Sequence, residues 1–146
     1  MTLTKTIIRV LRTLPFLVLA ALSIRAAAQA PQGRRHFAIN MGITADGLAE
    51  AVTKIPHIRT CAVLFLLATI AVGSRRLSLA FGLTMLIGAS WEVAEATGIG
   101  RNSRLVDLAP DLIGTFLSLV LVLLIRSLVN RFSTWQRRAQ DQPETG

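Results

Sequence analysis

Four apolar runs separated by charged connections restrict the fold of this 146-residue chain more than any other feature. They cover residues 13–24, 60–73, 77–91 and 112–125. With 52% hydrophobic and only 16% charged residues, the chain carries too little charge for a water-soluble globular protein of this length. We therefore predict an all-α fold, an integral membrane bundle of four transmembrane helices in a single domain.

Each run is shorter than the roughly 20 residues that a helix needs to cross about 30 Å of hydrocarbon. The runs reach that length only by extension into polar sequence. Arg75, Arg76 and Arg126 close one end of the last three runs, so the polar extensions lie at the other ends. The expected spans are near residues 8–28, 55–73, 77–97 and 106–126.

The distribution of charge predicts the orientation of these spans. Four spans leave nine Lys or Arg and two acids on the side of the termini, against seven Lys or Arg and six acids on the other side. Because basic residues accumulate in cytoplasmic segments, both termini are expected on the cytoplasmic side of the membrane. The loop at 29–54 is then external, and residues 127–146 form a basic cytoplasmic tail.

The net charge of +8 is thus interpreted as a topology signal. The chain has no tyrosine and few other aromatic residues to stack on bases, so nucleic acid is not an expected partner. Membrane lipids are the expected partners, and the oligomeric state is left open. The single cysteine, Cys61, excludes an intrachain disulfide and a cysteine-based metal site.

The first run allows two interpretations. Lys5, Arg9 and Arg12 precede it and small residues follow it, which is typical of a secretory signal peptide. The alternative is a retained helix over about residues 8–28, with arginines extending to the interface at each end. A retained helix gives the even number of spans that fits the distribution of charge.

Segment 91–118 concentrates ionisable residues where the third and fourth spans are expected to end and begin. Glu92 and Glu95 are three residues apart and Asp107 and Asp111 are four apart, so each pair shares a helix face. Ionisable groups at a membrane are costly to desolvate, so the cluster predicts a ligand-binding site or an ionic contact between helices. The polar extension of the second span lies on the same side and adds Lys54 and His57. The candidate residues are therefore Lys54, His57, Glu92, Glu95, Arg101, Arg104, Asp107 and Asp111.

Below the two aspartates, Gly114 and Ser118 form a small-xxx-small pattern that lets another helix backbone come close. We expect this face to support a close pairing of the third and fourth spans. Two members of the segment also have simpler explanations, since Asp107 suits the N-cap of a helix and Trp91 suits a membrane interface.

Three chemistries remain open for the cluster. With Arg59 included, its four acids are balanced by Lys54, Arg59, Arg101 and Arg104, so it can be a neutral network that fixes the helix ends. Four carboxylates can instead bind a hard cation such as Mg²⁺ or Ca²⁺, with His57 as a base. The arginines can bind a phosphate or carboxylate. Zinc is disfavoured because a single histidine is near, and we predict no metal and no cofactor.

At these residues the chain resembles the VanZ-like membrane protein family. The family has Asp-Lys-x-x-His before a span, and Lys54 and His57 keep that spacing, with Thr53 in place of the aspartate. Its second pattern is an acid followed by Gln, Arg, Asp, Asn, Gly and Gly. The matching positions here are Glu92, Glu95, Arg101, Asp107, Asp111, Gly114 and Ser118.

Here Glu95 and Asp111 replace two amides, so the cluster is more anionic than the family pattern. The resemblance implies a four-helix membrane protein, and the founding member of the family is associated with teicoplanin resistance. No catalytic mechanism is settled for the family.

Three functional hypotheses follow. The first is a protein that binds an envelope or lipid headgroup ligand at the cluster and affects envelope properties such as glycopeptide (teicoplanin-type) resistance. The second is a membrane-embedded, metal-dependent hydrolase or transferase acting on a lipid-linked substrate. The third is an accessory subunit that packs on a partner helix.

Overall fold

The computed structural model describes residues 3–29, 39–96 and 103–140. Within these residues, four helices are long and apolar enough to cross a membrane. They are α1 (Leu3–Ala28), α3 (Ile55–Val72), α4 (Leu77–Ala96) and α5 (Leu108–Gln140). This confirms the predicted all-α fold of a multi-pass membrane protein.

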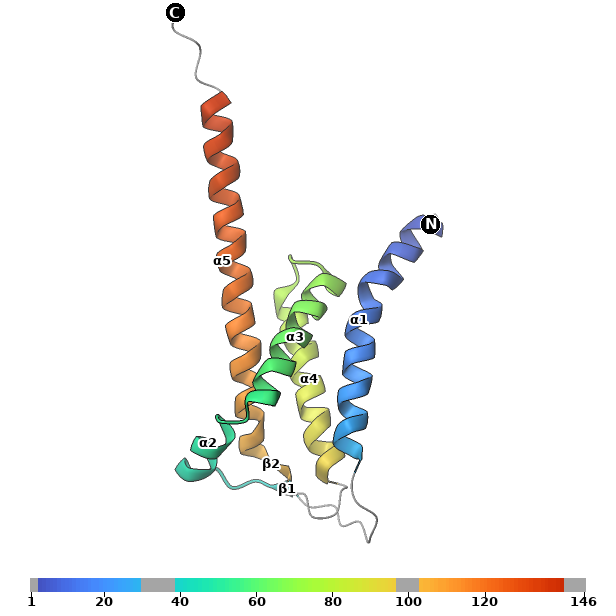
Figure 1. Cartoon of the computed structure of the whole chain (residues 1–146), viewed down its shortest axis with the longest axis vertical. Helices are drawn as coiled ribbons and strands as arrows, with labels where there is room; N and C mark the ends of the chain where they lie inside the picture. Colours follow the sequence, from blue (N-terminus) through green and yellow to red (C-terminus); the bar gives the residue numbers. More distant parts are fainter. Residues whose placement is uncertain (1–2, 30–38, 97–102, 141–146) are drawn as a thin grey trace, which may run out of the picture.

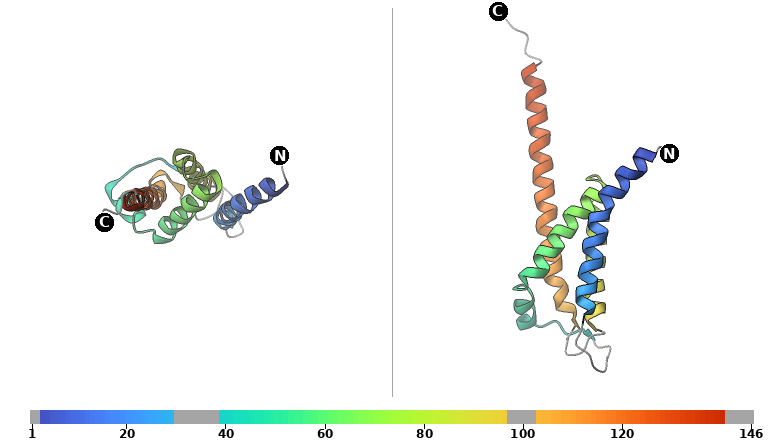
Figure 2. Two further views of the ribbon diagram at one scale, coloured as in Figure 1. Left: turned by 90° about the horizontal axis from the view of Figure 1, so that it is seen from above. Right: turned by 45° about the vertical axis from the view of Figure 1, so that its right-hand side comes forward.

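Helix α3 lies at the centre of the bundle and packs on α1, α4 and α5 (Figures 1 and 2). Leu64 and Phe65 of α3 are fully buried in these contacts, whereas Leu86, Leu117 and Leu124 of the neighbouring helices are exposed. A continuous exposed apolar surface is unusual for a soluble monomer. It suits helices that face lipid on the outside and one another on the inside.

The helix boundaries follow from prolines and a glycine. Pro56 and Pro110 lie in the first turns of α3 and α5, where backbone N–H groups lack intrahelical partners in any case. Gly73 ends α3 with a φ of 90°, and its N–H donates to the Thr69 carbonyl at 2.9 Å. Because positive φ suits glycine, the chain turns tightly here into α4, which begins at Leu77.

Helix α5 is longer than the span predicted at 106–126. It has 33 residues, which is about 50 Å at 1.5 Å per residue. Its C-terminal part projects beyond the other helices and carries the basic residues of the predicted tail (Figure 1).

Short elements cover the end of the bundle where α3 and α5 begin and α4 ends, here called the polar end. They are α2 (Ala45–Ala51), the 3-10 turn η1 (Leu105–Asp107), β1 (Ile39–Asn40) and β2 (Ser103–Arg104). β1 and β2 pair in parallel, with Ile39 opposite Ser103. The Thr44 hydroxyl caps α2 by accepting from the Gly47 N–H at 3.1 Å.

Candidate functional site

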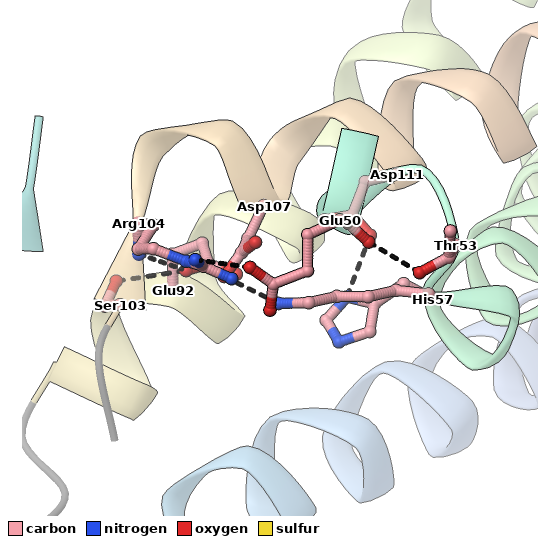
Figure 3. A network of polar contacts seen from close by, with 9 residues as sticks. Glu50, Thr53, His57, Glu92, Ser103, Arg104, Asp107 and Asp111 are labelled. Atoms are coloured by element: carbon pink, nitrogen blue, oxygen red, sulfur yellow. Dashed lines mark hydrogen bonds and ion pairs between the residues drawn. The ribbon is translucent and has the colours of Figure 1, made fainter. Parts of the chain in front are cut away.

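Ionisable side chains from α3, α4, α5 and the segments between them meet at the polar end (Figure 3). We call this set the polar network. Its members are Glu50, Lys54, His57, Glu92, Ser103, Arg104, Asp107 and Asp111.

Asp107 ties the start of α5 to the residue before α3. Its Oδ2 lies 2.7 Å from the Lys54 Nζ and 3.6 Å from the Arg104 Nε. The Asp107 side chain is only 2% exposed, which makes its negative charge costly to bury. The positive charges of Lys54 and Arg104 offset that cost. This contact fixes the entry of α3 against the entry of α5.

Glu92 connects the end of α4 to the strand that precedes α5. Its Oε2 accepts hydrogen bonds from the Ser103 hydroxyl at 3.0 Å and the Arg104 backbone N–H at 3.3 Å. The buried Oε1 of Glu92 has no hydrogen-bond partner among the described residues. Ser103 was not among the residues singled out from sequence, because nothing in its local pattern distinguishes it from other loop serines.

Arg104 also holds α2 in place. Its Nη1 lies 2.9 Å from Glu50 Oε2. The hydrogen bond and the positive charge of Arg104 lower the pKa of Glu50, and Glu50 in turn raises the pKa of Arg104. Because Glu50 is 62% exposed, this ion pair is a surface contact of small energy.

The second aspartate of α5 orients the histidine of α3. Asp111 Oδ1 lies 3.2 Å from His57 Nδ1, and the Asp111 side chain is fully buried. The Trp91 ring meets the His57 ring edge to face, with centroids 5.2 Å apart. When the Asp111 carboxylate is ionised, Nδ1 of a neutral His57 carries the hydrogen, so Nε2 is the nitrogen left for another partner.

A cavity of about 460 Å³ lies between α1, α3 and α4, on the side of His57 that faces away from Asp111 (Figure 3). Figure 3 shows the His57 ring between Asp111 and the ribbon of α1. One wall of the cavity is mostly apolar and comes from α1, and the facing wall includes His57, Trp91 and Glu95. The α1 residues that line it are Leu19, Leu22, Ser23, Ala26 and Ala27.

The structure thus divides the predicted cluster. Glu92 belongs to the polar network, whereas Glu95 lines the cavity, although the two residues lie one helical turn apart. Arg101 lies outside the described residues. Trp91, which suits a membrane interface by sequence, is 5% exposed and packs against His57.

The small-residue face of α5 is expected from sequence to pack on α4, but Gly114 packs on α3. A Cβ on Gly114 would collide with the backbone carbonyl of Ile58 in α3, so this glycine allows α3 and α5 to touch. The expected pairing of α4 with α5 relies on Gly88, where a Cβ would lie 2.6 Å from Asp111 Oδ2. Ser118 is buried one turn beyond Gly114.

The carboxylates of the network do not converge on a common point. Asp107 faces Lys54, Asp111 faces His57, and Glu92 faces Ser103. Among the described residues no group of three or more His, Cys, Asp or Glu side chains is placed to hold a metal ion. In the described residues, the network is thus a set of ion pairs and hydrogen bonds beside a cavity.

Comparisons with protein-family models, with curated proteins and with solved structures find no match to this chain.

Proposed function

We propose that the chain is a VanZ-like protein of the bacterial inner membrane that binds the headgroup of an amphiphile, either a lipid or a lipid-linked envelope precursor. The observation that carries this proposal is the cavity between α1, α3 and α4, which joins an apolar wall to His57, Trp91 and Glu95. An amphiphile has the same division between an apolar chain and a polar head.

His57 is the residue we expect to contact the headgroup. Asp111 holds its Nδ1 at 3.2 Å, so Nε2 is available to accept a hydrogen bond when the ring is neutral or donate one when it is protonated. A fixed ring loses little freedom when a ligand binds, which favours affinity. The Trp91 ring limits rotation of the imidazole from the side.

The rest of the polar network is proposed to act as a scaffold for this histidine. The Lys54–Asp107 ion pair joins the start of α3 to the start of α5. The His57–Asp111 contact joins the same two helices one turn further along. The ion pair therefore sets the spacing of the two helices that supply the histidine and its aspartate.

The charge distribution supports an orientation with both termini in the cytoplasm, so the cavity opens toward the outer leaflet. Ligands available there include phospholipid headgroups and exported envelope precursors. Binding such a molecule would change the composition or supply of envelope material. The resemblance of Glu92, Asp107 and Gly114 to the VanZ-like pattern makes teicoplanin susceptibility the first envelope property to measure.

The direct test is the amount of amphiphile that the full chain retains on purification in mild detergent, measured by native mass spectrometry. We expect His57→Gln to reduce occupancy about tenfold, since it removes an oriented polar contact. Ala26→Phe should reduce it as well by filling the cavity from the α1 side.

Two matched variants serve as controls. Arg59→Gln alters an exposed residue of α3, and Ala21→Phe adds the same ring to an exposed position of α1; neither residue lines the cavity. Both should retain wild-type occupancy. Equal occupancy in wild type, His57→Gln and Ala26→Phe would contradict binding in this cavity.

The envelope part of the proposal needs cells. Teicoplanin susceptibility should differ between cells that express wild type and cells that express His57→Gln at matched abundance. If the lipid is retained in the cavity but susceptibility is the same in both strains, headgroup binding stands and the link to glycopeptide resistance fails.

A further inference from the structure

We propose a second binding site, at the opposite end of the bundle, for the phosphate group of an anionic membrane lipid. A cavity of about 950 Å³ lies there between the N-terminal half of α1 and the turn that joins α3 to α4. We call it the basic cavity. Its charged lining residues are Lys5, Arg9, Arg12, Arg75 and Arg76.

The shape of α1 opens this cavity. Pro15 lies inside α1, where it removes one backbone hydrogen bond of the helix. Figure 1 shows the N-terminal end of α1 leaning away from α3 and α4, and residues of this part of α1 line the cavity together with the end of α3. The site is therefore concave, with walls from two segments that are far apart in the sequence.

Two arginines bind backbone carbonyl groups beside the cavity: Arg12 joins its two walls, and Arg126 ties the turn to α5. Arg12 donates from Nε and Nη2 to the Ile70 carbonyl, at 3.1 and 2.7 Å. Arg126 of α5 donates from Nη1 to the Ser74 carbonyl at 2.8 Å. Both carbonyls belong to the end of α3 and its turn, where the helix lacks intrahelical donors. These hydrogen bonds fix the position of the backbone that carries the other basic residues of the cavity, Lys5, Arg9, Arg75 and Arg76.

Those cations have no carboxylate nearby among the described residues. The described acids lie in α2, in the last turns of α4 or around the start of α5, which places all of them at the polar end. The ion pairs in the described part of the chain are there too. Within the described residues, Lys5, Arg9, Arg75 and Arg76 thus form a positive site with no carboxylate beside it, which an anion of high charge density would neutralise.

Apolar groups in the same cavity favour a lipid as the source of that phosphate. Ile8, Ala71 and Val72 line it beside the cations. Exposed apolar side chains such as Leu11 and Leu14 continue along α1 toward the middle of the bundle. An acyl chain can follow this surface while its headgroup lies among the arginines, as expected for basic pockets at the ends of transmembrane helices.

The test measures binding of short-chain phosphatidylglycerol to the full chain in detergent, beside short-chain phosphatidylcholine and inorganic phosphate. Wild type should bind phosphatidylglycerol at least tenfold more tightly than either of the other two. Arg75→Gln/Arg76→Gln should weaken phosphatidylglycerol binding about tenfold or more, because two cations near the headgroup are lost. Arg131→Gln/Arg137→Gln removes the same charge from exposed positions of α5 and should stay within about twofold of wild type.

Three results would overturn the proposal. Equal binding of the two lipids would remove the requirement for an anion. Equal loss in the two double variants would show that total charge alone matters. Inorganic phosphate binding as tightly as phosphatidylglycerol would assign the site to a free anion rather than a lipid. If Arg75→Gln/Arg76→Gln does not fold, Lys5→Gln/Arg9→Gln tests the same cavity from its α1 wall, with the same expected loss.

Discussion

Gly114 is a residue at which a single methyl group decides how closely two helices pack. A Cβ there would overlap the Ile58 carbonyl, and the backbone of α3 has no flexible atom to move aside. We expect Gly114→Ala to lower the free energy of unfolding by about 1–3 kcal/mol, as overpacking does in well-packed cores. Denaturant titration in detergent measures this change.

Gly82 is the matched control for that substitution. It lies in α4, and a Cβ there meets no described atom within 4 Å. Gly82→Ala should leave stability unchanged or raise it by up to about 1 kcal/mol through helix propensity. Similar losses in both variants would mean that glycine flexibility, and not the contact with α3, explains the effect.

Asp107 offers a second test at the residue scale. Its carboxylate is nearly buried, with Lys54 at 2.7 Å and Arg104 at 3.6 Å. Lys54→Met should lower the free energy of unfolding by about 2 kcal/mol, since the carboxylate then keeps only Arg104, 3.6 Å away. The double variant Lys54→Met/Asp107→Leu should recover part of that loss, because no buried charge is left without its partner. A double variant less stable than Lys54→Met would contradict this account.

Among the elements, α2 is attached to the bundle by a contact that depends on pH. Arg104 lowers the pKa of Glu50 below the value of 4.5 for a free side chain. The ion pair is therefore fully formed above about pH 4.5 and is lost as pH falls through the lowered pKa of Glu50. Because Glu50 is largely exposed, the effect on overall stability should be small.

A carboxyl ¹³C titration of Glu50 by NMR measures that shift directly. The midpoint should lie lower in wild type than in Arg104→Gln, in which the cation and the hydrogen bond are both lost. An unchanged midpoint would show that Arg104 does not contact Glu50 in solution.

At the element scale the helices could be predicted from sequence, because their signal is local. Apolar composition marks the body of each span, and Arg75 and Arg76 mark the turn between α3 and α4, although α5 continues past Arg126 to Gln140. These basic ends also imply that the polar extensions share one side of the membrane. For that reason the sequence alone places Lys54 and Asp107 in one cluster.

Contacts that depend on how helices tilt could not be predicted in this way. A helical face is wide, so the sequence does not specify whether Gly114 meets α3 or α4. For the same reason, the sequence does not predict that Trp91 is buried, or that Glu95 lines the cavity while Glu92 contacts Ser103. The β1–β2 pairing is also not predictable, because two-residue strands leave no periodic pattern.

At the scale of the whole molecule, the described acids all lie at the polar end, where Lys54 and Arg104 pair with them, and the described charged residues at the opposite end are all basic. The turn between α3 and α4 and the N-terminal part of α1 belong to that basic end. Such segregation predicts the orientation of the bundle in the membrane. On our proposal the polar end faces away from the cytoplasm.

Cysteine labelling in intact cells tests this orientation. Cys61 is fully buried, so Cys61→Ala provides a silent background. Ala49→Cys on exposed α2 should react with a membrane-impermeant maleimide from outside, and Ser74→Cys in the opposite turn only after permeabilisation. The reverse pattern would invert the topology and move both proposed sites to the other leaflet.

Retention of α1 is the property on which the two proposed sites jointly depend. α1 supplies Leu22 and Ala26 to the cavity beside His57, and Lys5 and Arg9 to the basic cavity. We therefore expect protein isolated from membranes with a C-terminal tag to have an intact mass that includes residues 3–28. A mass that begins near residue 30 would mean cleavage as a signal peptide. It would leave each cavity without one wall and rule out both sites at once, whereas a full-length mass combined with failed lipid binding would count only against the site concerned.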